Sequence, residues 1–314
     1  MEFYLAPMEG LTGFVYRSAF CTFFSDIDKY FSPFLVPTQK KVLRTREKED
    51  IAPEHNKGMN FVPQILTHRS DYFLEAVKML NEMGYQEINL NAGCPSPTVV
   101  TKGKGAGLLK DIGRLDAFLE ESFKGLEREK LNCRISIKTR IGMEDAKEFP
   151  NLLRIFNRYP ISELILHPRV GAQKYTGSPD YEAFAYALEY AEHPLCYNGD
   201  IYSPEDYENF CQLFPEVKKI MIGRGLMADP SLIRQIKGGD KASGEELKAF
   251  HDSIYQSYLE TSIHPGAAVP RMKELWTYLG RNMPEEKKAL KRIKKAKNIE
   301  EYEEAVRMIF SKSI

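Results

Sequence analysis

The residue best placed for chemistry in this sequence is Cys94, because a short β-type run, Glu87–Leu90, ends just before it. Pro95 and Pro97 follow it directly. Proline fixes φ and removes a backbone donor, so this loop has few conformations to lose when it orders. A free cysteine is most often a small buried hydrophobe. At the end of a strand, in a loop restricted by two prolines, we instead predict a thiol that meets a substrate.

The other cysteines give no sign of a disulfide framework or a metal centre. The five cysteines (Cys21, Cys94, Cys133, Cys196 and Cys211) are widely spaced, and no Cys-x-x-Cys pair occurs. This usage predicts a protein of the reducing cytoplasm without a structural zinc site. The N-terminus does not resemble a signal peptide and no apolar run approaches membrane-spanning length, so we predict no membrane association.

Short β-type runs alternate with helical patterns over the first three quarters of the chain. The helical patterns are Asp71–Met83, Leu115–Leu126, Tyr181–Ala191 and Pro204–Leu213. The eight β-type runs are Phe3–Ala6, Lys29–Phe34, Phe61–Leu66, Glu87–Leu90, Arg134–Thr139, Glu163–His167, Leu195–Asn198 and Lys219–Ile222. Ser70 and Ser203 are expected to cap helices at the N-terminal end, and Gly84 at the C-terminal end. Eight βα units predict an α/β fold, a (β/α)8 TIM barrel over residues 1–238.

The remaining residues, 239–314, predict a small all-α helical domain. Gly238–Gly244 is a turn-rich break, and the helical patterns Glu245–Ser262, Ala267–Leu279 and Pro284–Ile314 follow it. A strip of seven cations without an acid (Lys287, Lys288, Lys291, Arg292, Lys294, Lys295 and Lys297) lies in the last of these. Such a strip is usually a solvated helix face, but it could also grip a phosphate backbone. Because the chain has 44 basic and 44 acidic residues, any nucleic-acid contact must come from a local patch of this kind.

In a (β/α)8 barrel the chemistry lies at the carboxyl ends of the strands. Seven of the expected strands end in polar or permissive residues: Pro7, Met8 and Glu9; Gln64; Asn91 and Cys94; Lys138 and Arg140; His167 and Arg169; Asn198, Gly199 and Asp200; Gly223 and Arg224. Any one of these residues could have a purely structural role. Their shared position at the strand ends nevertheless predicts one site at the mouth of the barrel. The last two groups occupy the part of this fold that usually binds phosphate, which favours a phosphorylated cofactor or substrate.

Lys138 and Gln64 bear on which cofactor that would be. A flavin needs a cation near N1 and hydrogen-bond partners along its pyrimidine edge, and lysine and glutamine can supply these. Lys138 could equally be a Schiff-base lysine if its site is desolvated and the substrate carries a carbonyl group. The residues alone leave both possibilities open.

The whole pattern resembles the tRNA-dihydrouridine synthase family, in its bacterial form. The resemblance is carried by Ala6–Met8, Gln64, Asn91–Pro95, Gly105–Leu109, Lys138–Arg140, His167 with Arg169, Asn198–Asp200, Met221–Gly225 and Arg271–Leu279. These motifs occur in the family's order and cover nearly the whole chain. Pro63, before Gln64, departs from the family's usual apolar residue and puts the local backbone in question.

The resemblance implies an FMN enzyme that reduces the C5–C6 double bond of selected uridines in tRNA, with NADPH as reductant. Cys94 would protonate C5 while hydride from reduced FMN reaches C6, and Asn91 would read the uracil edge. The residues expected to bind FMN are Pro7, Met8, Glu9, Gln64, Lys138, His167, Asn198, Gly199, Asp200, Gly223 and Arg224. Those expected to contact tRNA are Arg140, Arg169, Tyr175, Arg271 and Lys273, with Lys102, Lys104 and the lysine strip as further candidates.

The chemistry of a thiol agrees with the role of an acid. Protonating carbon requires a thiol that stays protonated until it reacts, and an ordinary cysteine pKa of about 8.5 meets this need. A nucleophilic Cys94 would need supporting His and Asp or Asn residues, and none is evident around it. The base must leave its stack to react, and an unpaired D-loop uridine does so at low cost. Glu9, Gly10 and Arg271–Leu279 look most like relatives that act at position 16.

Two other functions remain in competition. One is a flavin-dependent barrel reductase of a small-molecule enone or pyrimidine, which would leave the basic helical domain without a purpose. The other is an RNA-binding protein that uses the barrel as a scaffold, although binding alone needs no acid at a strand end. We expect the enzyme to be monomeric, and the sequence assigns no role to the segment Thr38–Lys57.

Overall fold

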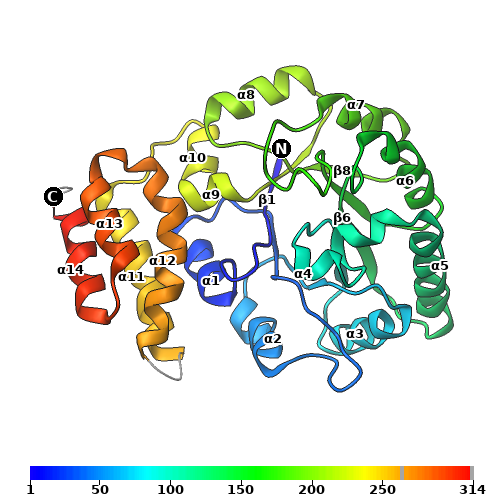
Figure 1. Ribbon diagram of the computed structural model, residues 1–314, viewed down its shortest axis with the longest axis horizontal. Coiled ribbons are helices and arrows are strands. Elements are labelled where there is room, and N and C mark those ends of the chain that lie inside the picture. The colour runs from blue at the N-terminus through cyan, green and yellow to red at the C-terminus, as the bar shows by residue number, and fades with distance from the viewer. Residues whose placement is uncertain (262–264, 312–314) are drawn as a thin grey trace.

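A computed structural model describes residues 1–261 and 265–311 of the chain. In these residues nine parallel strands form one sheet, in the order β3-β2-β1-β9-β8-β7-β6-β5-β4. The strands are β1 (Glu2–Leu5), β2 (Lys29–Phe31), β3 (Phe61–Val62), β4 (Gln64–Ile65), β5 (Glu87–Ala92), β6 (Arg134–Arg140), β7 (Glu163–His167), β8 (Leu195–Tyr197) and β9 (Lys219–Ile222). Helices surround this sheet, and a helical region lies against one side of it (Figure 1).

The nine strands make an eight-stranded barrel, because β3 and β4 are two parts of one strand divided at Pro63. Proline cannot donate to a strand ladder, which accounts for the interruption. On one side β3 pairs with β2, and on the other β4 pairs with β5. The Leu35 amide donates to the Gln64 carbonyl at 2.7 Å and closes the remaining gap. The sequence prediction of a (β/α)8 TIM barrel is therefore confirmed, with its third strand split in two.

Strand β5 alternates polar and apolar residues, although both of its faces are buried. In β5 the side chains of Ile88, Leu90 and Ala92 belong to the large apolar core between strands and helices. The intervening Glu87, Asn89 and Asn91 carry the polar groups of this strand, and all three are buried. Because successive side chains of a strand point to opposite faces, these three residues point into the barrel.

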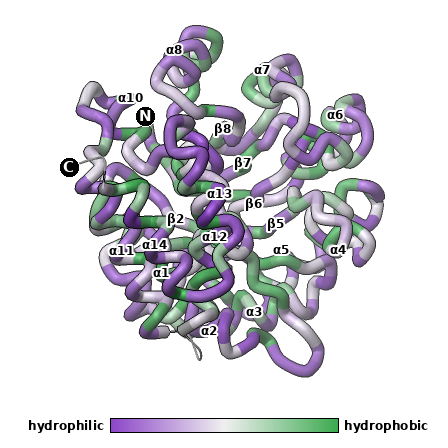
Figure 2. The backbone as a smooth tube through the Cα atoms, turned by 60° about the vertical axis from the view of Figure 1, so that its left-hand side comes forward, coloured by the Kyte–Doolittle hydropathy of each residue, from purple (hydrophilic) through white to green (hydrophobic). Residues whose placement is uncertain are grey.

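Ten helices of the described residues belong to the barrel region, and Figure 2 shows the strands inside a ring of helices. They are α1 (Phe14–Phe23), α2 (Thr45–Asp50), α3 (Ser70–Glu82), α4 (Pro97–Val100), α5 (Ile112–Arg128), α6 (Phe149–Phe156), α7 (Tyr181–Tyr190), α8 (Pro204–Leu213), α9 (Arg224–Ala228) and α10 (Leu232–Ile236). The N-cap at Ser203 is confirmed, since its hydroxyl accepts from the Asp206 amide at 3.1 Å. Gly84 follows α3 with a φ of 95°. The prediction for Ser70 was wrong: Arg69 precedes the helix, and the Ser70 hydroxyl instead donates to Glu121.

The unassigned segment Thr38–Lys57 packs against the start of the barrel. It contains α2, whose last residue, Asp50, accepts hydrogen bonds from the Phe14 amide at 2.6 Å and from Arg17 at 3.1 Å. Arg17 is completely buried, so the carboxylate of Asp50 compensates a cation that would otherwise be costly to bury. The segment thus holds the first βα unit in place.

The C-terminal region is helical throughout its described residues. It consists mainly of α11 (Gly244–Thr261), α12 (Ala268–Leu279), α13 (Lys287–Lys295) and α14 (Ile299–Phe310). The predicted pattern Pro284–Ile314 is divided, because Asn298 starts a new helix by accepting from the Glu301 amide at 2.9 Å. Residues 262–264 and 312–314, at the ends of two predicted helices, lie outside the described residues.

An aromatic contact joins this region to the barrel. The Phe250 ring, on α11, lies within 5.2 to 6.1 Å of the rings of Tyr16, Phe20, Phe23 and Phe24 around α1. The predicted domain boundary at residue 238 falls in the turn between α10 and α11, where Gly238 has a φ of 87°. A membrane-crossing helix is not found among the residues that the structure describes.

Candidate active site

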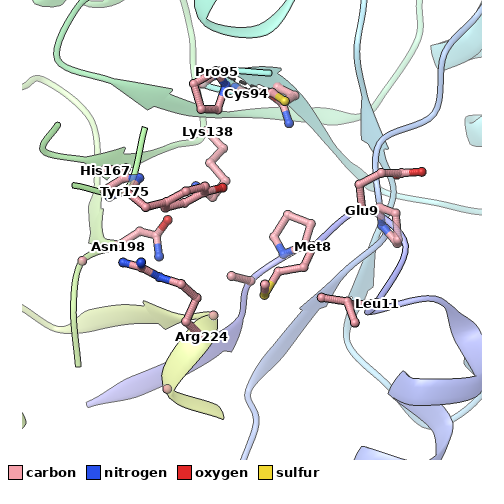
Figure 3. Close-up of a pocket in the computed structure, with 18 of the residues that line it drawn as sticks. Met8, Glu9, Leu11, Cys94, Pro95, Lys138, His167, Tyr175, Asn198 and Arg224 are labelled. Carbon is pink, nitrogen blue, oxygen red and sulfur yellow. Dashed lines mark hydrogen bonds between the residues drawn. The ribbon is translucent and has the colours of Figure 1, made fainter. Parts of the chain in front are cut away.

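A pocket opens at the carboxyl ends of the barrel strands, and Figure 3 shows many of the residues around it. Fourteen of the residues singled out from the sequence line it: Pro7, Met8, Glu9, Asn91, Cys94, Lys138, Arg140, His167, Tyr175, Asn198, Gly199, Asp200, Gly223 and Arg224. Gln64, Arg169, Arg271 and Lys273 are not among the lining residues. Cys94 lies near the top of this view and Arg224 lower down, with Lys138, Tyr175 and Asn198 between them.

The backbone around Cys94 is held from several directions. The Asn91 side-chain oxygen accepts from the amides of Gly93 and Cys94 at 3.1 and 2.9 Å. The Cys94 carbonyl accepts from the Ala106 amide at 3.0 Å. Gly105 packs so closely that a Cβ there would lie 2.7 Å from the Cys94 carbonyl oxygen and 3.0 Å from its Cβ. These contacts fix the position from which the thiol faces the pocket.

The surroundings of Cys94 keep its thiol protonated. Burial raises the pKa of Cys94, and this effect outweighs the lowering by the Ser96 amide and by the nearby cations Arg140 and Lys138. The side chain nevertheless remains partly exposed at the pocket wall. A protonated, accessible thiol can act as an acid, whereas a nucleophilic cysteine requires a lowered pKa.

Lys138 is a half-buried cation without an acidic partner among the described residues. No hydrogen bond or ion pair joins its ammonium group to any other described residue. Burial, helped by the neighbouring charge of Arg140, lowers the pKa of Lys138 to about 8. An unpaired cation in such a place is costly, so its position at the pocket wall indicates a negatively charged or carbonyl-bearing ligand.

His167 faces the same pocket as a neutral imidazole. Its pKa lies well below the ordinary value, first because it is buried and then because of the cations Arg140, Lys138 and Arg169. Arg169 lies 3.1 Å from the ring nitrogen Nε2. Because a guanidinium group only donates, Nε2 must accept, and the ring proton is then on Nδ1.

The loops after β8 and β9 form a cradle in which side chains would not fit. A Cβ on Gly199 would collide with the Tyr197 hydroxyl, and one on Gly225 would collide with the Ile201 carbonyl. The amides of Gly199, Arg224 and Gly225 find no acceptor among the described residues. Free amides at close-approach glycines suit an anion such as a phosphate.

Charged groups accompany this cradle. Arg224 lies at its edge, with its guanidinium carbon 4.8 Å from the Tyr175 ring centre and 5.5 Å from that of Tyr202. Arg224 forms an ion pair with Asp200, and Asp200 also forms an ion pair with Arg169 at 2.6 Å. Asp200 therefore orients two arginines, and a carboxylate in this position would not itself bind a phosphate.

Two arginines expected to contact RNA are instead buried in the loops. Arg140 is 2% exposed and donates to three carbonyls, those of Gly93, Val170 and Lys174, at 2.9, 3.0 and 2.7 Å. Arg169 is completely buried between His167, Asp200 and the Gly177 carbonyl. Both guanidinium groups donate to loop residues, and their contact with tRNA stays a prediction. Arg140 joins the loop after β7 to the loop after β5, and Arg169 joins it to Asp200 in the loop after β8. Tyr175, from the loop after β7, is 56% exposed at the pocket.

Gln64 also differs from its expected place. It is completely buried behind Asn91, where it donates to Asn89 and accepts from Asn91, both at 2.8 Å. It thus supports a lining residue and does not itself form the wall.

The helical region contributes one side of the pocket, which the sequence reasoning missed. Glu274 and Tyr278 of α12 are lining residues. Arg271, selected for its charge, donates to the Gly10 carbonyl at 3.1 Å and so joins α12 to the loop after β1. Lys273 donates to the Ala296 carbonyl at 2.8 Å, within the helical region. The spacing 271, 274, 278 places one helix face toward the barrel, and this spacing could have identified the two missed residues.

Other lining residues were also not selected from the sequence. Pro33 and Phe34 after β2, and Tyr202 after β8, are apolar or aromatic and carry no distinctive motif. Residues 1–261 and 265–311 contain no group of three or more His, Cys, Asp or Glu side chains able to hold a metal ion.

Comparison with known proteins extends these observations. Residues 4–311 match the family described as dihydrouridine synthase. A probable tRNA-dihydrouridine synthase of Helicobacter pylori (strain J99) is 30% identical over 241 residues, covering 74% of this chain and 69% of that protein. A tRNA-dihydrouridine(16) synthase of Pseudomonas putida is 26% identical over 296 residues, covering 91% and 90%.

Solved structures share the fold at much lower identity. The old yellow enzyme from Trypanosoma cruzi has a TM-score of 0.56 at 9% identity, over 78% of this chain and 91% of that one. A mutant of morphinone reductase in complex with tetrahydroNAD has a TM-score of 0.54 at 9% identity, over 79% and 90%. At this identity the likeness concerns the barrel itself.

Proposed function

Because the chain belongs to the dihydrouridine synthase family, we propose that it reduces the C5–C6 double bond of a uridine in tRNA to 5,6-dihydrouridine. The observation that carries this proposal is a protonated thiol on the wall of a pocket that also holds an unpaired, half-buried lysine and an anion cradle. A cysteine hydrolase would need a thiolate, and an RNA-binding scaffold would need neither group.

The residues present fit FMN as the cofactor. The unpaired ammonium group of Lys138 suits the N1–C2 carbonyl side of a flavin ring, where negative charge develops on reduction. The close-approach glycines, the free amides of Gly199 and Gly225, and Arg224 suit the terminal phosphate. Pro7 and Met8 would lie along the ring. When bound, FMN would supply the hydride for C6 after reduction by NADPH.

The chain's own residues would complete the reaction. Cys94 donates its proton to C5, and the raised pKa of this thiol retains the proton until the base is in place. Asn91 has one side-chain N–H left for a carbonyl oxygen of the uracil, because its other N–H donates to Gln64. Its oxygen accepts from the amides of Gly93 and Cys94. His167, neutral and buried, would donate from Nδ1 to the cofactor or its phosphate without adding charge.

Binding of tRNA would rest on the exposed lysines of α13 and on Lys297 just after it. Lys287, Lys288, Lys291, Lys294, Lys295 and Lys297 are exposed and have no acidic partner among the described residues, whereas Arg292 pairs with Glu304 at 2.7 Å. Their contacts with phosphates would weaken as salt is added. Lys102, Lys104, Tyr175, Arg271 and Lys273 would contribute contacts nearer the pocket. We further propose a D-loop uridine at position 16, in keeping with the name of the Pseudomonas putida relative, and a monomeric, cytoplasmic enzyme.

The test is Cys94→Ala, with Cys133→Ala as its matched control at the opposite end of the barrel. We expect Cys94→Ala to keep the yellow colour of bound flavin and its affinity for tRNA. Its rate of dihydrouridine formation should fall by about 10²- to 10⁴-fold, the range for losing a general acid. Cys133→Ala should match the parent protein in all three measurements. Filter binding at several salt concentrations measures tRNA affinity, and mass spectrometry of tRNA from a deletion strain locates the uridine.

Each part of the proposal can fail separately. An unchanged rate in Cys94→Ala would remove the acid role. A protein that stays colourless with added FMN would remove the flavin. Absence of tRNA binding even at low salt, with flavin bound, would favour a reductase of small molecules.

A further inference from the structure

A column of polar side chains runs inside the barrel. It starts at the floor, where the strands begin, and ends at the Cys94 loop, the residues after β5 at the mouth. It lies on β4, β5 and β6, and its members are Glu87, Ser136, Asn89, Gln64 and Asn91. Ser136, Asn89 and Gln64 have no exposed surface, and Asn91 and Glu87 are 7% and 9% exposed. Polar groups are buried at a cost unless they are bonded, so their arrangement calls for an explanation.

Every member of the column is hydrogen-bonded to the next. The Ser136 hydroxyl donates to Glu87 at 3.0 Å and accepts from the Asn89 amide nitrogen at 3.0 Å. The Asn89 oxygen accepts from Gln64 at 2.8 Å, and the Gln64 oxygen accepts from Asn91 at 2.8 Å. The Asn91 oxygen then accepts from the amides of Gly93 and Cys94. The chain of bonds is continuous from the floor to the catalytic loop.

Every hydrogen bond of the column is donated toward Glu87, and this carboxylate determines that direction. Both carboxylate oxygens of Glu87 accept from Lys29 at 3.1 Å, so the serine hydroxyl must donate to this group. The serine lone pairs then require the nitrogen of Asn89, and each following amide is oriented in turn. At the upper end an acceptor faces two backbone amides. A reversed Asn91 would place its NH2 group against both of them.

Packing alone does not require this column. The other half of the barrel interior is filled by an apolar cluster that includes Phe31, Val62, Ile165 and Met221. Amides and apolar side chains of similar volume fill such a space equally well, and a polar network brings stability only when every member is satisfied. What the polar half adds is a defined orientation of the Asn91 side chain at its upper end.

We propose that Asn89, Gln64 and Ser136 are positioning residues, which carry the hydrogen-bond polarity of Glu87 to Asn91 and thereby hold the Cys94 loop closed. The consequence for the thiol is a fixed place against the pocket wall. The consequence for the substrate is that Asn91 presents a donor, and so selects a base with a carbonyl oxygen at that edge. The catalytic consequences rest on the proposed function, whereas the hold on the loop does not.

The experiment measures the reactivity of the Cys94 thiol with iodoacetamide, followed on its own peptide by mass spectrometry across a range of pH. Asn89→Leu breaks the column at its middle. Asn89→Asp keeps the acceptor for Gln64 but, when ionised, cannot donate to the Ser136 hydroxyl. Ile165→Val is the control for altered packing on the apolar side. Free energies of unfolding are measured for all three variants.

Asn89→Leu should loosen the loop and hydrate the thiol, which removes part of the burial that raises its pKa. Its alkylation at neutral pH should become about three- to tenfold faster, since the thiolate fraction grows tenfold for each unit by which the pKa falls. Ile165→Val should react like the parent protein, whatever stability it loses. Asn89→Asp should react faster than the parent but more slowly than Asn89→Leu, since it keeps the acceptor for Gln64 and loses the donor to Ser136. If Asn89→Leu does not fold, Ser136→Ala makes the same test with a smaller change.

Unchanged reactivity in Asn89→Leu would overturn the proposal. So would reactivity that rises in all three variants in proportion to lost stability, because that result describes a purely structural column. The measurement needs neither flavin nor tRNA, so it stands even if Cys94→Ala proves to be fully active. With tRNA, Asn89→Leu should form dihydrouridine about tenfold more slowly at unchanged flavin occupancy, the loss expected for a slightly misplaced acid.

Discussion

The floor and the mouth of the barrel both contain lysines that are buried or half-buried, but only the floor provides acids for them. At the floor, Lys29 lies 3.1 Å from Glu87 and 3.4 Å from Glu163, and Lys219 lies 2.6 Å from Glu163. At the mouth, Lys138 has no acidic partner within residues 1–261 and 265–311, and Asp200 pairs with arginines. Balanced charges at the floor stabilise the fold, whereas the unbalanced charge at the mouth is available to a ligand.

The pKa values of two lysines follow this division. Burial acts to lower the pKa of Lys219, but the Glu163 carboxylate outweighs it and the pKa is raised. For Lys138 burial acts without a carboxylate, and the pKa falls to about 8. The same residue type in one barrel therefore shifts in opposite directions, according to its partner.

The largest effect should come from breaking the floor. Glu163→Ala would leave Lys219 without its carboxylate and Lys29 with only Glu87. We expect the free energy of unfolding to fall by about 3–5 kcal/mol, the cost of leaving a buried charge uncompensated. Denaturant titration of the flavin-free protein measures this. A loss below about 1 kcal/mol, the size of an exposed ion pair, would mean that the floor is not a stabilising cluster.

A smaller and opposite effect is expected at the mouth. Lys138→Met should weaken FMN binding by about ten- to a hundredfold, equivalent to one hydrogen bond to a charged group. The flavin-free variant should be at least as stable as the parent at neutral pH, because an uncompensated cation is removed. Fluorescence titration with FMN and denaturant titration measure the two quantities. Equal flavin affinity, or a clear loss of stability, would place Lys138 with the floor lysines.

The pH dependence of this difference checks the same assignment. A lysine whose pKa is lowered in the folded state is protonated in the unfolded chain between about 8 and 10.5, while the folded protein has lost the proton. The unfolded state then binds more protons, so Lys138 contributes rising stability as the pH increases through this window. The advantage of Lys138→Met over the parent should therefore shrink between pH 8 and 10.5.

The smallest effect should come from an exposed member of the floor. Arg134 lies 3.5 Å from Glu87, but its side chain is 68% exposed. Arg134→Ala should cost about 0.2–1 kcal/mol, as for other exposed ion pairs, and less at high salt. The comparison with Glu163→Ala separates burial from mere proximity of charges. A loss as large as that of Glu163→Ala would contradict this separation.

Much of the architecture and of the pocket was predictable from the sequence. The β-type runs and their polar ends placed Cys94, Lys138, Asn198 and Arg224 around one mouth, because parallel strands of a barrel end on the same side. Alternation along β5 also shows which side chains point inward. These inferences use local patterns and one rule of the fold, and the structure bears them out.

Other features depend on contacts between distant residues. A strand-end arginine looks the same in sequence whether it binds a ligand or, like Arg140, spends its donors on loop carbonyls. Gln64 likewise lies behind Asn91 only because the third strand is split at Pro63 and closes against β5. Glu274 was missed because the docking of α12 against the mouth is set by tertiary packing, which the helical pattern alone does not reveal.

The contact of α12 with the loop after β1 has a consequence for protein engineering. Glu274 and Tyr278 form part of the pocket, and Arg271 binds the Gly10 carbonyl. A chimera that takes its barrel from this chain and its C-terminal helices from a relative would therefore also rebuild the wall around the reacting base. Exchanging the two parts as independent modules would alter turnover and tRNA choice together, unless the loop at residues 9–11 is transferred along with α12.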